Sequence, residues 1–200
     1  MSKGYDIMSK VIYLQNRKNK VDYGGKFMIK PEIMAKYALE KNKITDVPVN
    51  PIDIARKEGI AVKGINMDEL FSVENDVLGI IRKDKTGKIT IIVDNEIDGK
   101  DIRFTVAHEL GHYFLNHLSE DNNHHIVEFH RSTTDHTDEN EIAATKFASA
   151  LLMEEKNIKS KFKILKDAEF TKEQILVVLG KFFGVKDEVV DNRLRDLELI

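Results

Sequence analysis

The chain has 200 residues, of which 42% are hydrophobic and 32% charged, with a formal net charge of −3 and no cysteine. These values exclude a disordered chain, a membrane-embedded one and a protein with a general nucleic-acid-binding charge. Because cysteine is absent, disulfides and thiolate metal sites are also excluded, and any metal must be held by histidine and carboxylate side chains.

The first thirty residues show the weakest pattern of the chain. Residues 11–15 and 26–29 are compatible with short strands around a basic turn, but a loose arm fits equally well. The segment has no apolar core followed by a small-residue cleavage site, so it does not resemble a secretion signal. We therefore expect residues 1–30 to form an N-terminal arm of a cytoplasmic protein.

Two helices are predicted between residues 31 and 59. Pro31 suits the first turn of a helix that continues to about residue 42. Asn50 can cap a second, short helix with Pro51 at its first position, and Gly59 can end it.

Three apolar segments follow that have the composition of β-strands. They cover residues 60–65, 77–83 and 88–94, and the turn sequence DKTG joins the last two. A turn of this kind between two apolar runs predicts a β-hairpin. We expect a small antiparallel sheet in which the 77–83 strand has an exposed edge. By analogy with other proteins that bind peptides, and not from the sequence pattern, an extended peptide could pair with this edge.

The segment RFTVAHELGHYFLNH, residues 103–117, carries a His-Glu-x-x-His motif made of His108, Glu109 and His112. Positions four apart lie on one helix face, so both imidazoles can reach the same metal ion. Glu109 lies about 100° further round, where it can act as a general base toward a water molecule. Asp98 is a suitable N-cap for this helix. The pattern is that of a zinc peptidase.

Two other interpretations of this segment are less consistent with the sequence. The motif could be a chance match with two buried histidines satisfied by ordinary hydrogen bonds, but burying them beside a glutamate is unfavourable without a metal or another partner. A metzincin would need glycine at position 115 and histidine at 118, and the chain has leucine at both. We therefore expect His117 to lie at the helix end on the surface, near the last carbonyl groups.

The third metal ligand has to come from another segment, and Glu141 is the best candidate. It heads a predicted helix from about residue 139 to 153, in a stripe of small and apolar residues that includes Ala144 and Ala148. The stripe would let this helix approach the metal helix closely. Glu141 could instead form a capping box with Asp138, and the two roles are compatible.

Other residues of the same region are weaker candidates. Glu139 is an alternative carboxylate, and four histidines lie in a polar segment where solvent exposure is the simplest expectation: His124, His125, His130 and His136. His130 follows the short apolar run IVEF, a possible strand. It is our first choice for a side chain that stabilises the transition state of peptide hydrolysis.

The C-terminal region, residues 156–200, is predicted to be helical. Thr171 and Gln174 form a capping box, and a turn at Gly184 separates two amphipathic helices in a helix-turn-helix arrangement. The second helix carries Lys186, Asn192, Arg193 and Arg195, but also five acidic residues that would repel phosphate. We favour packing on the core over DNA binding.

Four segments occur together and in order: PVNPIDIARKEGIAV, a hairpin ending KITIIVD, RFTVAHELGHYFLNH and ENEIAATKFASALLM. This set resembles the ImmA/IrrE family of metallopeptidases over roughly residues 31–155. Two positions depart from the family pattern, because Thr145 stands where asparagine is usual and Glu154 where proline is usual.

The resemblance implies an α+β fold. Its zincin-like core, residues 31–155, would pack a small antiparallel sheet on the His-Glu-x-x-His helix and precede a helical C-terminal region. By position in the motifs, His108, His112 and Glu141 would bind Zn²⁺ and Glu109 would be the general base. Members of the family are cytoplasmic bacterial or mobile-element proteins that cleave a partner transcriptional repressor, and some belong to pairs that resemble toxin–antitoxin systems.

The expected function is that of a zinc-dependent endopeptidase. Its substrate would be a specific cytoplasmic protein, a helix-turn-helix repressor, with no membrane or nucleic-acid partner. Two alternatives stay open: a non-catalytic partner-binding module of a regulator or toxin–antitoxin pair, and a DNA-binding regulator acting through the C-terminal helices. The intact motif argues against the first, because a binding module could replace Glu109 without losing the metal.

Overall fold

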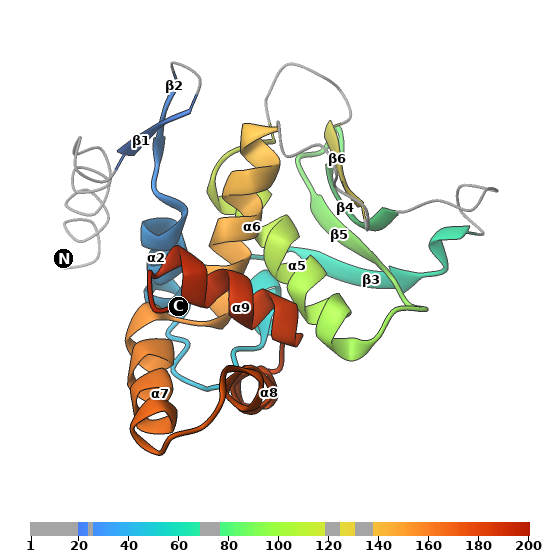
Figure 1. Ribbon diagram of the computed structural model, residues 1–200. Helices are drawn as coiled ribbons and strands as arrows, with labels where there is room; N and C mark the ends of the chain where they lie inside the picture. Colours follow the sequence, from blue (N-terminus) through green and yellow to red (C-terminus); the bar gives the residue numbers. More distant parts are fainter. Residues whose placement is uncertain (1–19, 24–25, 69–76, 119–124, 131–137) are drawn as a thin grey trace.

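A computed structural model of the chain describes residues 20–23, 26–68, 77–118, 125–130 and 138–200 (Figure 1). Its elements, in chain order, are β1 Lys20–Tyr23, β2 Lys26–Ile29, α2 Pro31–Lys41, α3 Pro51–Lys57, β3 Ala61–Ile65, β4 Val77–Lys83, β5 Ile89–Asp94, α5 Gly99–Phe114, β6 His125–His130, α6 Glu139–Leu152, α7 Glu155–Asp167, α8 Lys172–Phe183 and α9 Asp187–Asp196. The expected α+β class is confirmed. None of the described helices combines the length and apolar character needed to cross a bilayer.

A four-stranded sheet with the order β3-β5-β4-β6 forms one side of the fold. The predicted hairpin is present as the antiparallel pair β4–β5, in which Ile81 lies opposite Ile91. Strand β6 covers the IVEF run and pairs antiparallel with β4. Strand β3 runs parallel to β5, so the sheet is mixed where a purely antiparallel sheet was expected. Strand β5 lies between β3 and β4, and it runs parallel to β3 and antiparallel to β4.

The edge expected on the 77–83 strand is not available. Strand β4 is hydrogen-bonded to β5 on one side and to β6 on the other, so its backbone is paired along both edges. The expectation was wrong because β6, which follows the metal helix by ten residues, adds to the sheet at that position. The outer strand on this side is β6.

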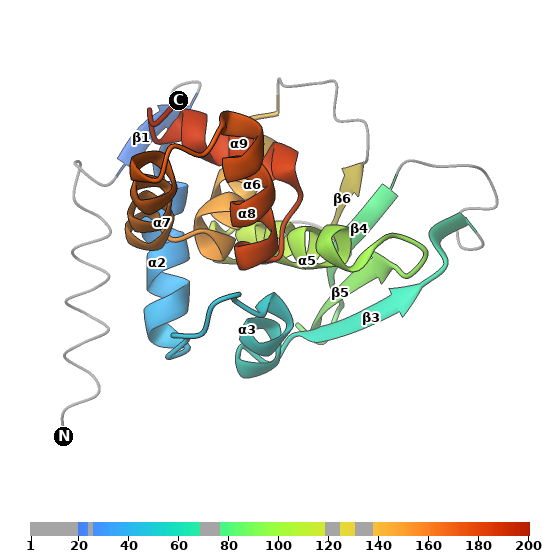
Figure 2. The same cartoon turned by 60° about the horizontal axis from the view of Figure 1, so that its bottom comes forward.

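Helix α5 lies at the centre of the molecule, between the sheet and the helices α6 and α2 (Figures 1 and 2). Strands β4 and β5 are buried on both faces: Ile81, Ile91 and Val93 belong to the main core shared with the helices. On the opposite face, Ile80 and Ile92 pack with Met67 in a smaller second cluster. An alternating strand pattern thus places one set of side chains against α5.

Side-chain caps fix where α5 and α3 begin. The carboxylate of Asp98 accepts hydrogen bonds from the backbone N–H groups of Lys100 and Asp101 at 2.7 and 3.0 Å. The side chain of Asn50 accepts one from Ile52 N–H at 3.1 Å. Such caps satisfy backbone donors that the helix itself cannot pair, and both confirm the sequence prediction.

At the N-terminus, the predicted strand 26–29 is present as β2 and pairs antiparallel with β1. The other predicted strand, residues 11–15, lies outside the described residues, so the interpretation of 1–30 as an arm stays a prediction.

The C-terminal helices are tied to α5 by a half-buried arginine. The Arg103 guanidinium donates to the carbonyl oxygens of Val49 at 2.6 Å, Gly184 at 3.1 Å and Phe183 at 3.2 Å. Phe183 and Gly184 form the end of α8, where Gly184 takes the left-handed conformation with φ of 67°. The guanidinium therefore satisfies carbonyl groups at a helix C-terminus while joining three distant segments.

The cations considered for DNA binding are engaged elsewhere. The Lys186 ammonium lies 2.6 Å from Asp101 and 3.3 Å from Asp98, at the start of α5. Arg193 is almost fully buried and donates to the Met153 carbonyl oxygen at 3.4 Å. Arg195 is paired with Asp191 at 2.7 Å within α9. These contacts favour the packing role of the C-terminal pair.

We predict that Arg103→Met lowers the free energy of unfolding by about 2–3 kcal/mol, because it removes three charge-assisted hydrogen bonds and leaves carbonyl groups without a donor. Chemical denaturation would measure the loss. The matched control is Arg56→Met, since Arg56 is exposed and paired only with Asp53 within its own helix, and this change should cost less than about 1 kcal/mol. Equal stabilities for the two variants would show that the C-terminal helices are not coupled to α5 through Arg103.

Candidate metal centre

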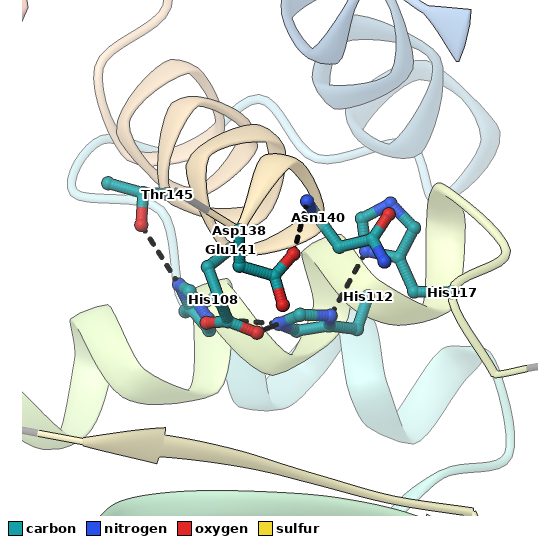
Figure 3. Close-up of polar contacts among 7 residues, drawn as sticks. All are labelled: His108, His112, His117, Asp138, Asn140, Glu141 and Thr145. Carbon is teal, nitrogen blue, oxygen red and sulfur yellow. Dashed lines mark hydrogen bonds and ion pairs between the residues drawn. The ribbon is translucent and has the colours of Figure 1, made fainter. Parts of the chain in front are cut away.

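Helices α5 and α6 bring three potential ligands to one point (Figure 3). The Nε2 atom of His108 lies 3.0 Å from Oε2 of Glu141, and the Nε2 atom of His112 lies 3.2 Å from Oε1 of the same carboxylate. The two Nε2 atoms are 3.0 Å apart. All the ligand atoms lie within 4.8 Å of one another, and no other such group of side chains occurs among the residues described.

The two helices approach closely because Gly111 faces Ala144. A Cβ atom placed on Gly111 would lie 2.9 Å from the Cα atom and 3.0 Å from the carbonyl oxygen of Ala144. Real side chains do not tolerate such distances to backbone atoms. Glycine in the middle of the His-Glu-x-x-His turn therefore sets the separation of α5 and α6, and with it the distance from Glu141 to the imidazoles.

Glu109 points from α5 toward the sheet, against Gly79 of β4. A Cβ atom on Gly79 would lie 2.3 Å from the Cγ2 atom of Thr105 and 3.0 Å from Oε1 of Glu109. The pairing of β4 with β6 shifts register between Val77 and Gly79 at this point. A glycine at an irregular strand position is typical of a close approach to another group.

The Glu109 carboxylate is fully buried, and neither oxygen has a well-formed hydrogen bond to the described residues. Burial, reinforced by the charge of Glu141, raises the pKa of Glu109 well above its usual value, and the backbone N–H of Ile81 opposes this shift only in part. A buried carboxylate without a full set of partners is unfavourable unless a cation or a ligand group completes its surroundings.

Two of the potential ligands, His108 and Glu141, have electrostatics suited to a cation. Burial, together with His112, lowers the pKa of His108 to about 4 against the opposing effect of Glu141, so its imidazole is neutral at pH 7. Burial disfavours the charged form of Glu141, but its hydrogen bonds and charge interactions with His108 and His112 hold its pKa well below the usual value. A neutral imidazole and an ionised carboxylate are the forms in which these side chains bind metals.

Two further side chains contact the outer nitrogens of the imidazoles. The hydroxyl oxygen of Thr145 lies 3.3 Å from Nδ1 of His108, and Nδ1 of His117 lies 3.0 Å from Nδ1 of His112 (Figure 3). Groups in this position orient the ring and determine which nitrogen carries the proton. Thr145 was noticed only as a departure from the family pattern, and its contact could have been foreseen from its spacing of four residues after Glu141.

The expectation for His117 was wrong. Its backbone N–H does bond to the His112 carbonyl oxygen at 2.9 Å beyond the helix end. Its side chain, however, is partly buried and lies edge-on to the His112 ring, with centroids 5.0 Å apart. The reason is that the chain turns back at Asn116, which has a positive φ of 60°, and this turn brings residue 117 under the helix. Periodicity along a straight helix could not have shown it.

The remaining candidate residues are acidic side chains at the start of α6 and histidines of the segment between α5 and α6. Asp138 caps α6 by accepting from Asn140 N–H at 2.8 Å, while the Glu141 side chain turns to the histidines, so the capping box is not closed. Glu139 is not part of the cluster. His130 ends β6 opposite Val77, two residues from Gly79, but its side chain lies outside the described part of the structure, as do those of His124, His125 and His136.

The residues present fit a divalent metal ion. Two nitrogens and a carboxylate oxygen form a donor set that zinc accepts readily, and they leave a coordination position for a further ligand. The Nε2 atoms of His108 and His112 lie 3.0 Å apart and both face the Glu141 carboxylate, so one ion could contact all three side chains.

A His-Glu-x-x-His helix packed beneath a small sheet, with a glutamate from the next helix beside the motif, defines the zincin-like class of proteins. A model of the peptidase M78 family, described as the IrrE N-terminal-like domain, matches residues 77–195. This match covers more than half of the chain, which therefore belongs to that family. It includes α7, α8 and most of α9, beyond the segment on which the sequence resemblance rested. No curated protein matches the chain.

We predict that Gly111→Ala weakens metal binding at least tenfold and destabilises the fold by about 1–3 kcal/mol, because overpacking forces α5 and α6 apart. A competition titration against a chromophoric chelator would give the affinity, and thermal denaturation the stability. Gly99→Ala in the same helix is the control, since a Cβ atom there has no neighbour within 4 Å. If both variants bind metal as the parent does, the close contact does not set the geometry of the site.

We also predict that His117→Ala weakens metal binding by about tenfold to a hundredfold, because the ring of His112 loses the group that orients it. The same chelator competition would measure this effect. His117→Gln, whose amide oxygen can accept a hydrogen bond from Nδ1 of His112, should recover part of the affinity. An unchanged affinity in the alanine variant would reduce His117 to a neighbour without influence on the site.

Proposed function

We propose that this protein is a zinc-dependent endopeptidase in which His108, His112 and Glu141 hold the ion and Glu109 is the general base. The family is that of a metallopeptidase domain, and the three potential ligands lie close enough to bind one metal. The observation that carries the proposal is the buried carboxylate of Glu109. It lies one residue from a potential ligand, without well-formed hydrogen bonds from the described residues, as a group reserved for a substrate or a water molecule would.

The chain supplies the proton transfers of the reaction. When bound, zinc would polarise the peptide carbonyl group and make an attacking water molecule more acidic. Glu109 would accept a proton on a carboxylate oxygen and later return it to the departing amine nitrogen. The raised pKa of Glu109 suits the first of these steps, because a carboxylate with a raised pKa is a stronger base toward the attacking water molecule than one with an ordinary pKa.

Strand β6 is the best position for the substrate. Since β4 is paired on both sides, an extended peptide can add to this side of the sheet only along the outer edge of β6. His130, at the end of this strand and opposite Val77, keeps its proposed role as a residue that stabilises the transition state. Its support is the position of its backbone near Gly79, which contacts Glu109.

The substrate we propose is a specific cytoplasmic protein, a helix-turn-helix transcriptional repressor. Family membership supports a protein substrate, and the repressor follows from the family resemblance alone. The binding-module alternative is less well supported, because a protein that only binds a partner does not need a buried carboxylate such as Glu109 beside its metal site. The DNA-binding alternative is disfavoured by the engagement of Lys186 and Arg193 with α5 and the core.

We predict that Glu109→Gln retains zinc but slows peptide hydrolysis by about a hundredfold to ten-thousandfold, because the amide cannot accept the proton. Glu141→Ala should lose both zinc and hydrolysis. Cleavage would be followed by mass spectrometry on a proteome-derived peptide library, and bound zinc by elemental analysis.

Near-normal cleavage by Glu109→Gln would refute the general-base assignment, and full zinc occupancy in Glu141→Ala would remove this residue from the metal site. Incubation with casein and with the repressors of the same genome tests selectivity. Cleavage of one repressor at a single position supports the proposal, whereas general digestion of casein contradicts it.

A further inference from the structure

The large apolar side chains that remain exposed are concentrated in one region. Among the residues described, six are exposed, at 37–58%, and all lie after residue 163: Ile164, Phe170, Val177, Val178, Phe182 and Ile200. The first five belong to the hairpin of α7 and α8. A cluster of this kind is typical of a surface that meets another molecule, whereas scattered single residues are not.

Helix α8 is apolar on both of its faces. Ile175, Leu179 and Phe183 are buried in the core, while Val177, Val178 and Phe182 lie on the exposed face at helical spacing. A helix with apolar residues all round is normally covered on all sides. Within the described structure, these three side chains keep 37–40% of their surface exposed.

The hairpin that carries this face is rich in lysine. The hairpin, residues 155–183, has seven lysines and four acidic residues, a formal charge of +3 in a chain whose total is −3. The Lys161 ammonium lies 4.8 Å from the centre of the Phe182 ring. Lys159 and Lys163 pair with acidic residues of their own helix, but Lys161, Lys166 and Lys181 have no ion-pair partner in the described residues.

We propose that Ile164, Phe170, Val177, Val178 and Phe182, with Lys161, Lys166 and Lys181, form a docking surface for an acidic amphipathic helix of the protein substrate. The apolar side chains would receive the apolar stripe of that helix, and the lysines would face its carboxylates. This inference rests on the proposed function, to which it adds a second recognition site outside the metal centre.

Two other occupants are outcomes of the test. A second copy of the chain would bring two faces of charge +3 together, which is unfavourable. An anionic membrane surface would engage the same lysines and apolar side chains, but membership of a peptidase family favours a protein partner.

The test uses the full-length chain with the Glu109→Gln change, so that bound peptide is not cut. The probe is a fluorescent 21-residue peptide with leucines at helical spacing and glutamates between them. The comparison peptides are a scrambled isomer and a version with lysine in place of glutamate. Fluorescence anisotropy should show binding of the acidic helix at least tenfold tighter than of either comparison peptide, and weaker binding at higher salt.

Two surface variants and two matched controls locate the binding. Val178→Ser with Phe182→Ser, and separately Lys161→Glu, should each weaken binding of the acidic peptide at least tenfold. Ile200→Ser, an equally exposed apolar residue outside the hairpin, and Lys85→Glu, in the β4–β5 turn, should leave it unchanged. Circular dichroism would show that the variants remain folded.

Two results with peptides would overturn the proposal: equal binding of the scrambled peptide, or surface variants that bind the acidic peptide as tightly as the parent does. Two other results would identify a different occupant. If the parent binds phosphatidylglycerol vesicles, or forms a dimer, and the surface variants do not, the surface meets a membrane or a second copy of the chain. Peptide binding does not require zinc, so the metal-free protein should give the same affinity. If the acidic peptide binds but the parent chain hydrolyses no peptide, the proposed function is wrong and the docking surface stands. If the parent chain hydrolyses peptides but the acidic peptide does not bind, the docking surface is wrong and the proposed function stands.

Discussion

The contact between Gly111 and Ala144 sets the distance on which the rest of the site depends. Because no side chain separates α5 from α6 at this point, the first turn of α6 reaches the two imidazoles with a carboxylate. The same helix α5 packs its other side on β4, where Gly79 again removes a side chain and allows Glu109 to rest against the strand. Gly111 and Gly79 thus set the separations of α6 from α5 and of α5 from β4, because neither has a side chain that would push the neighbouring element away.

Much of this arrangement was accessible from the sequence because it depends on local periodicity. The i, i+4 histidines, the caps at Asp98 and Asn50, the β4–β5 hairpin and the helix headed by Glu141 all follow from neighbours within one or two turns. The family resemblance, now confirmed for residues 77–195, raised Glu141 from a reasonable stripe position to a specific candidate. Its convergence with both histidines is visible in the structure, while its role as a ligand stays a proposal.

What the sequence could not show depends on contacts between distant segments. The parallel pairing of β3 is set by the position of β5 in the sheet, and the closure of the β4 edge by β6, which lies after the metal helix in the chain. His117 turns under the helix because of a backbone reversal at Asn116, where a left-handed conformation breaks the helical spacing on which the prediction relied. Arg103 gave no signal at all, since its partners are carbonyl groups up to 81 residues away.

The burial of Glu109 also has a consequence for the evolution of the protein's stability. A leucine at this position would occupy similar space between α5 and Gly79 without enclosing a carboxylate that lacks a full set of partners. The metal-free fold would then be more stable with leucine than with the natural residue. If Glu109 has the proposed catalytic role, the protein keeps a residue that opposes its own folding because activity and stability make conflicting demands on one side chain. Random mutagenesis followed by selection for thermostability alone would be expected to replace Glu109 early and to leave His108 and His112 in place.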